Sequence, residues 1–142
     1  MRSTLLAVLV ILAACGEATR PSTDLRYASW LMGCSMVGTE TWITLSSNNA
    51  DSAAPVHPFV SIRIAKPLGE VQGSWVTGSP SVRAFYAMSP SLYQPAAPLG
   101  NVTILGVNAD SVIHGSFSLQ FPSRSIVGEF WAGWSHQVMA CA

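Results

Sequence analysis

The residues best suited to acid–base or metal chemistry in this chain are its three histidines, His57, His114 and His136. No two of them lie within four residues of each other, so their spacing forms no helical pair of metal ligands. Asp51 and Asp110 lie in turn-like segments, where aspartate usually serves the turn geometry. The chain has no Gly-x-Ser-x-Gly motif to present a nucleophilic serine. The sequence therefore predicts no catalytic residue, metal site or cofactor, and it leaves paired carboxylates of a small hydrolase as the alternative.

Three aromatic or apolar residues are the remaining candidates for binding a partner. Trp131 falls on the polar face of the last predicted hairpin, while Leu92 and Tyr93 fall in a proline-rich segment. Tryptophan in such a position can stack on a sugar or anchor a protein partner. The competing interpretation, which we favour, is that a loop covers the outer face of the sheet and buries Trp131.

The first 15 residues have the organisation of an export signal. Arg2 supplies a positive charge, Leu5–Leu12 is an unbroken apolar run, and Ala13 and Ala14 lead to Cys15. This stretch resembles a bacterial lipoprotein signal peptide, and Leu12 to Cys15 match its lipobox. A membrane-spanning helix and an ordinary secretory signal are the alternatives, but eight apolar residues fall well short of the roughly 20 that a span needs.

The resemblance implies where the protein is held. A helical signal peptide, residues 1–14, would be removed, and Cys15 would carry a diacylglycerol and often a further acyl chain such as palmitate. Residues 15–24 are then a flexible tether to the membrane, and residues 25–142 are the folded domain. Gly16 follows the lipidated cysteine, which in Gram-negative families permits passage to the outer membrane. We therefore expect a lipid-anchored protein of the bacterial cell envelope.

With Cys15 assigned to lipid, Cys34 and Cys141 remain, and we expect them to form a disulfide in this oxidising compartment. Acidic and basic side chains are equal in number, so the charge gives no reason to expect a nucleic-acid partner. The resemblance and the aromatic residues favour a non-catalytic binding or structural module that recognises an envelope protein or a saccharide. A small envelope hydrolase and a carrier of a small apolar ligand are the alternatives.

The domain is predicted to be all-β, because short β-branched and aromatic runs alternate with Gly, Pro, Asn and Asp. Strands are expected over residues 25–37, 39–46, 59–65, 72–77, 82–88, 102–107, 113–121 and 126–134, with a loop at 89–100. We predict a single antiparallel β-sandwich of about seven strands, with a small β-barrel as the alternative.

Alternation indicates which side chains face the core. Val60, Ile62 and Ile64 share one face of their strand, and Phe59, Ser61 and Arg63 share the other. In the last hairpin, a four-residue turn at 122–125 would pair Phe121 with Ile126, Phe117 with Phe130 and Gly115 with Ala132. The predicted inner face is then apolar throughout, with glycines leaving room for aromatic rings.

Overall fold

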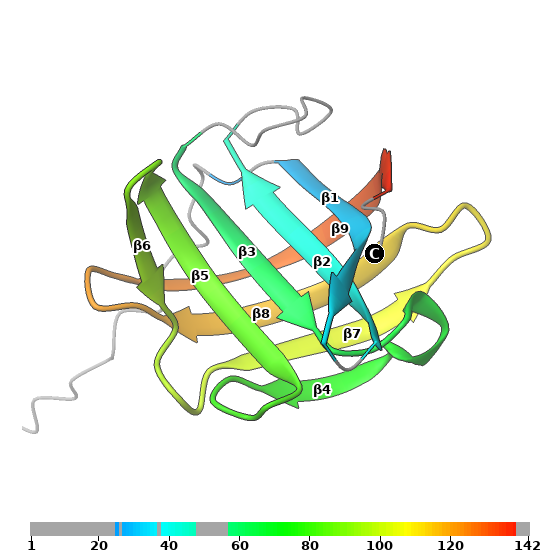
Figure 1. Cartoon of the computed structure of the whole chain (residues 1–142), viewed down its shortest axis with the longest axis horizontal. Coiled ribbons are helices and arrows are strands. Elements are labelled where there is room, and N and C mark those ends of the chain that lie inside the picture. Colours follow the sequence, from blue (N-terminus) through cyan, green and yellow to red (C-terminus); the bar gives the residue numbers. More distant parts are fainter. Residues whose placement is uncertain (1–24, 26, 37, 48–56, 139–142) are drawn as a thin grey trace, which may run out of the picture.

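The structure, a computed structural model, describes residues 25, 27–36, 38–47 and 57–138 (Figure 1). The predicted signal peptide, Cys15, the tether and Cys141 lie outside the described residues. Within the described ranges, no helix is long and apolar enough to cross a membrane.

The described chain forms nine strands and one short 3₁₀ turn, η1 (Leu68–Glu70). The strands are β1 (Tyr27–Ser35), β2 (Gly38–Ser46), β3 (Phe59–Ile64), β4 (Gly73–Val76), β5 (Val82–Ser89), β6 (Leu92–Pro95), β7 (Asn101–Val107), β8 (Ile113–Gln120) and β9 (Ser125–Val138). The prediction of an all-β fold is confirmed.

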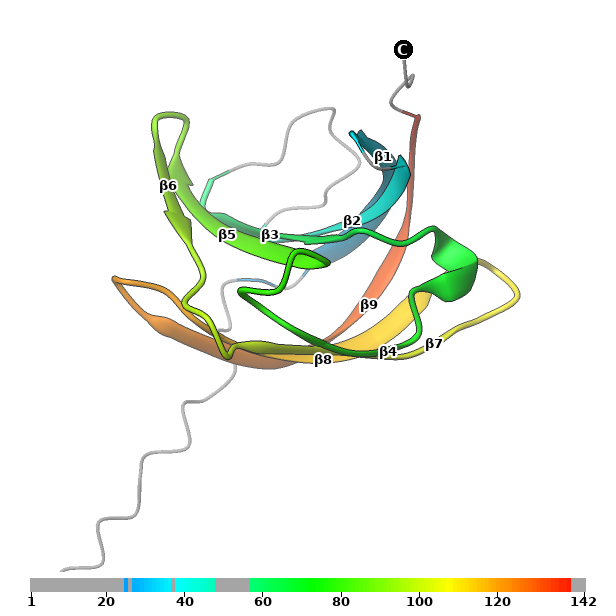
Figure 2. The same cartoon turned by 60° about the horizontal axis from the view of Figure 1, so that its bottom comes forward.

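The nine strands form one curled sheet in the order β4-β7-β8-β9-β1-β2-β3-β5-β6. Every neighbouring pair is antiparallel except β1 and β9, which are parallel. β9 has 14 residues, pairs first with β8 and then with β1, and so joins two layers that lie face to face (Figure 2). The prediction of a purely antiparallel sandwich of about seven strands is therefore wrong, because one long strand belongs to both layers and makes the fold a half-barrel.

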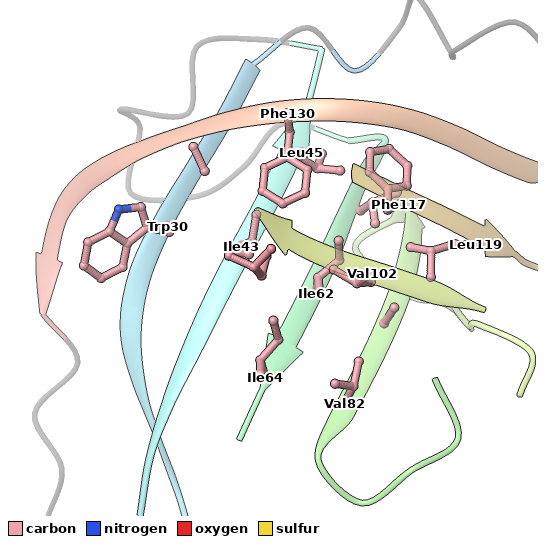
Figure 3. Packing of buried hydrophobic residues seen from close by; sticks show 14 of the residues in the cluster. Trp30, Ile43, Leu45, Ile62, Ile64, Val82, Val102, Phe117, Leu119 and Phe130 are labelled. Atoms are coloured by element: carbon pink, nitrogen blue, oxygen red, sulfur yellow. The ribbon is translucent and has the colours of Figure 1, made fainter. Parts of the chain in front are cut away.

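The core fills the space between the two layers. Val60, Ile62 and Ile64 of β3 are fully buried, which confirms the face predicted for them. Figure 3 shows Ile43, Ile62 and Val82 of one layer packing towards Val102 and Leu119 of the other. The opposite face of the β1-β2-β3-β5-β6 layer points away from this core, and it carries the site described below.

The closing hairpin has the predicted faces but a different register. Leu119 pairs with Ile126, and Gly115 pairs with Phe130 rather than with Ala132. Phe121 and Arg124 exchange backbone hydrogen bonds of 2.8 and 3.2 Å, so Pro122 and Ser123 alone form the turn. The register differs from the predicted one by two residues. A shift of two keeps every side chain on its own face, which is why the burial pattern is right and the pairing is wrong.

The segment predicted as a loop at 89–100 contains the edge strand β6, which pairs with β5 through Ala87 and Tyr93. The prolines of this segment argued against a strand, because proline lacks the N–H that a central strand donates. Pro95 is tolerated because β6 has a neighbour on one side only.

Candidate ligand-binding face

The predicted partner-binding residues do not come together. Trp131 is 59% exposed on β9, whereas Leu92 and Tyr93, 47% and 54% exposed, lie on the edge strand β6. Four strands separate β9 from β6 in the sheet. The expectation that a loop buries Trp131 is wrong, because this side chain instead stacks on His114 with ring centroids 4.4 Å apart.

Each histidine packs against an aromatic ring. His57 lies 5.0 Å from Phe59, and His136 lies 5.7 Å from Trp134, between ring centroids. His114 pairs with Trp131 across β8 and β9, and the neighbouring acid Glu129 pairs with Ser116. In the described part of the chain, no three His, Cys, Asp or Glu side chains are grouped so as to hold a metal ion.

A polar and aromatic cluster lies on the outer face of the β1-β2-β3-β5-β6 layer. Strand alternation and cross-strand pairing bring its members together, since Trp42 pairs with Arg63, Arg63 with Arg83, and Ser61 with Phe85. We call this surface the arginine face, and its residues are Glu40, Trp42, Phe59, Ser61, Arg63, Arg83, Phe85 and Tyr93.

Arg63 is the centre of the arginine face. Its guanidinium carbon lies 4.0 Å from the ring centroid of Trp42 and 5.5 Å from that of Phe85, which are cation–π distances. Burial lowers the pKa of Arg63, nearby Glu40 opposes this effect and Arg83 adds to it. Arginine nevertheless stays protonated near neutral pH. The Nε atom of Arg63 is buried and has no hydrogen-bond partner among the residues that the structure describes.

Glu40 is only 2% exposed, and both of its carboxylate oxygens are engaged. The indole Nε1 of Trp42 donates to Oε2 at 2.8 Å, and Nη2 of Arg83 donates to Oε1 at 3.1 Å. The cluster thus contains two guanidinium groups and one carboxylate. The carboxylate is bonded to Arg83 and Trp42, and among the described residues no ion pair joins it to Arg63.

Two adjoining hollows open on the arginine face. Phe59, Ser61, Arg63, Phe85 and Tyr93 line a hollow of about 270 Å³. A wider one of about 1150 Å³ includes Glu40, Arg63, Arg83 and Phe85 in its lining. Both hollows are lined by Arg63 and Phe85. A cation with aromatic neighbours therefore lies at the boundary between the two hollows.

Sequence reasoning found only part of this site. It identified Tyr93, and it placed Phe59, Ser61 and Arg63 on one face, but it gave that face no function. Glu40, Trp42, Arg83 and Phe85 were missed, because they come from β2 and β5 and only the strand order makes them neighbours of Arg63. The signal that was available is Arg63, the single charged residue of its strand, on the same face as Phe59.

Trp131 belongs to a different hollow, of about 350 Å³. The other lining residues come from the end of β7, from the connection that follows it and from His114 of β8. No Asp, Glu, Lys or Arg lines this third hollow. It offers stacking surface alone, whereas the arginine face combines stacking surface with charge.

Comparison with known proteins finds no family model that matches the chain, and no curated protein or solved structure that is similar to it.

Proposed function

We propose that this protein is a lipid-anchored component of the bacterial cell envelope whose β-domain binds a ligand or partner and catalyses no reaction. The observation that carries the binding role is the hollow beside Arg63. It has aromatic walls and a guanidinium group whose Nε atom has no hydrogen-bond partner in the described ranges. Binding sites commonly combine apolar walls with a few polar groups that orient the ligand.

The anchoring part of the proposal rests on the lipobox resemblance at Leu12 to Cys15. Each buried methylene of an acyl chain contributes about 0.8 kcal/mol, and two or three chains on Cys15 would hold the protein firmly at the membrane. Gly16 favours the outer membrane if the source is Gram-negative. An envelope protein or a saccharide remains the expected class of partner.

The two alternative functions have less support. A hydrolase needs convergent titratable groups, and within the described ranges each histidine packs on an aromatic ring and none is bonded to a carboxylate. A carrier of an apolar ligand needs an empty interior, whereas the space between the layers is filled by fully buried side chains such as Ile43, Ile62 and Ile104.

Complementation of a deletion strain tests both parts of the proposal. Cys15→Ser should abolish labelling by a fatty-acid probe and remove the protein from the membrane fraction. Tyr93→Ala should keep the label and the fold but weaken the phenotype, whereas Leu99→Ala, which alters a more exposed side chain outside the arginine face, should have no effect.

Two results would contradict the proposal. Persistent labelling of Cys15→Ser would end the lipoprotein assignment. A His57→Ala, His114→Ala or His136→Ala variant that folds, reaches the membrane and is inactive would favour the hydrolase.

A further inference from the structure

We propose that the arginine face binds small amphiphilic anions, in which a carboxylate or phosphate group is joined to an aromatic or other apolar body. This inference rests on the proposed binding function and names its ligand class. It follows from the charge state of the cluster and from the composition of the hollow beside it.

The charge of Arg63 is the first step. Trp42 and Arg83 each donate to one oxygen of Glu40, and among the described residues no ion pair joins Glu40 to Arg63. Burial disfavours the charged form of Arg63, as its lowered pKa indicates, and a buried donor without an acceptor costs free energy. Arg63 also lines both hollows, and its planar guanidinium group suits a carboxylate or phosphate placed there.

The walls of the hollow are the second step. Phe59, Phe85 and Tyr93 surround the space next to the guanidinium, and Ser61 is its uncharged polar residue. The volume of about 270 Å³ is close to the lower end of the range of small-molecule pockets. One fused ring system or a short chain fits such a space, with its charged end towards Arg63.

Preorganisation is the third step. Trp42 is fixed by its hydrogen bond to Glu40, and its ring lies against Arg63. The guanidinium is therefore held in place before a ligand arrives, which lowers the entropic cost of binding. Arg83, which is ion-paired and mostly exposed, lacks this support.

The test compares two nearly isosteric ligands, 2-naphthoate and uncharged 2-naphthamide. The mature lipoprotein in nanodiscs is titrated with each by calorimetry, and empty nanodiscs provide the blank. We expect the anion to bind about ten- to a hundredfold more tightly than the amide, as one charged hydrogen-bonded contact would give. Titration with 2-naphthyl phosphate then shows which oxyanion the site prefers.

Variants locate the effect. Arg63→Met keeps an apolar chain against Trp42 and should reduce the affinity for naphthoate to that for the amide. Arg124→Met is the matched control, because Arg124 also lies over an aromatic ring, Tyr86 at 5.6 Å, but away from the arginine face; it should leave both affinities unchanged. Glu40→Gln removes a negative charge and should tighten the binding of naphthoate. If Arg63→Met does not fold, Arg63→Lys, which keeps the charge but loses the planar donor group, should weaken the binding of naphthoate.

The outcomes separate this inference from the proposed function. Equal binding of naphthoate and naphthamide, with both weakened by Tyr93→Ala, would overturn the anion preference but leave a binding role. No binding of either compound would overturn the inference. In that case the binding role in the proposed function would fail as well only if the Tyr93→Ala variant fully complemented the deletion strain.

Discussion

Gly33 controls whether Trp42 can hold Arg63. The five-membered ring of the Trp42 indole lies directly over Gly33, so a β-carbon at this position would overlap the ring. Gly33 and Glu40 are paired across β1 and β2. The indole of Trp42 lies over Gly33 and donates its hydrogen bond to Glu40. The smallest residue in β1 is thus part of the support of the arginine face.

Gly33→Ala should lower the free energy of unfolding by about 1–3 kcal/mol, because the indole must move and its bond to the buried Glu40 is lost. Urea denaturation followed by circular dichroism measures this loss. Gly133→Ala is the matched control, since a β-carbon there meets no atom within 4 Å, and it should change the stability by less than about 0.5 kcal/mol. Equal stability of the two variants would mean that Trp42 does not rest on Gly33.

The hairpin of β8 and β9 shows how two glycines make room for aromatic rings. Phe117 pairs with Gly128, and Phe130 pairs with Gly115, so each ring lies opposite a residue without a side chain. The two phenylalanines contact each other diagonally, with ring centroids 6.2 Å apart. Both are buried, while Ser118 on the other face is exposed.

Gly115→Ala distinguishes the observed register from the predicted one. In the observed register, a β-carbon would lie 2.7 Å from the ring of Phe130 and 2.6 Å from the carbonyl oxygen of Thr103. We expect a loss of about 1–3 kcal/mol in urea denaturation, against less than about 0.5 kcal/mol for the exposed control Ser118→Ala. A fully stable Gly115→Ala variant would instead fit the predicted pairing of Gly115 with Ala132.

Alternation along a strand was readable from the sequence, whereas pairing between strands was not. The faces of β3, β8 and β9 follow from a period of two, which local sequence determines. The register of the hairpin depends on the length of its turn, and Pro122 to Ser125 allowed a longer turn than the one that forms. The arginine face needs the order β1-β2-β3-β5, which only long-range packing sets.

At the scale of the whole molecule, the parallel pairing of β1 and β9 bears on the predicted disulfide. Met32 pairs with Val138, so β1 and β9 run in the same direction towards Cys34 and residue 141. Cys34 takes part in an interaction in the structure. Cys141 lies outside the described residues, so its pairing with Cys34 stays a prediction, which this register supports.

Mass spectrometry under non-reducing conditions should find one peptide pair that joins Cys34 to Cys141. Reduction should lower the free energy of unfolding by up to about 4–5 kcal/mol, the chain-entropy value for a loop of roughly 100 residues. A Cys34→Ser, Cys141→Ser double variant should be insensitive to reductant. Two alkylatable thiols in protein taken directly from the envelope would contradict the pairing.

The place of β9 in the sheet also determines when the fold can form. β1, near the start of the domain, has β9, the last strand, as one of its two neighbours, and Trp30 is buried against Trp134 with ring centroids 5.8 Å apart. Contacts between such distant parts of a chain make folding slow. The β1–β9 joint cannot form before β9 has been synthesised, so the sheet stays incomplete until then. If the protein is exported as we propose, this late completion of the sheet would favour passage of the chain through a translocation channel before folding.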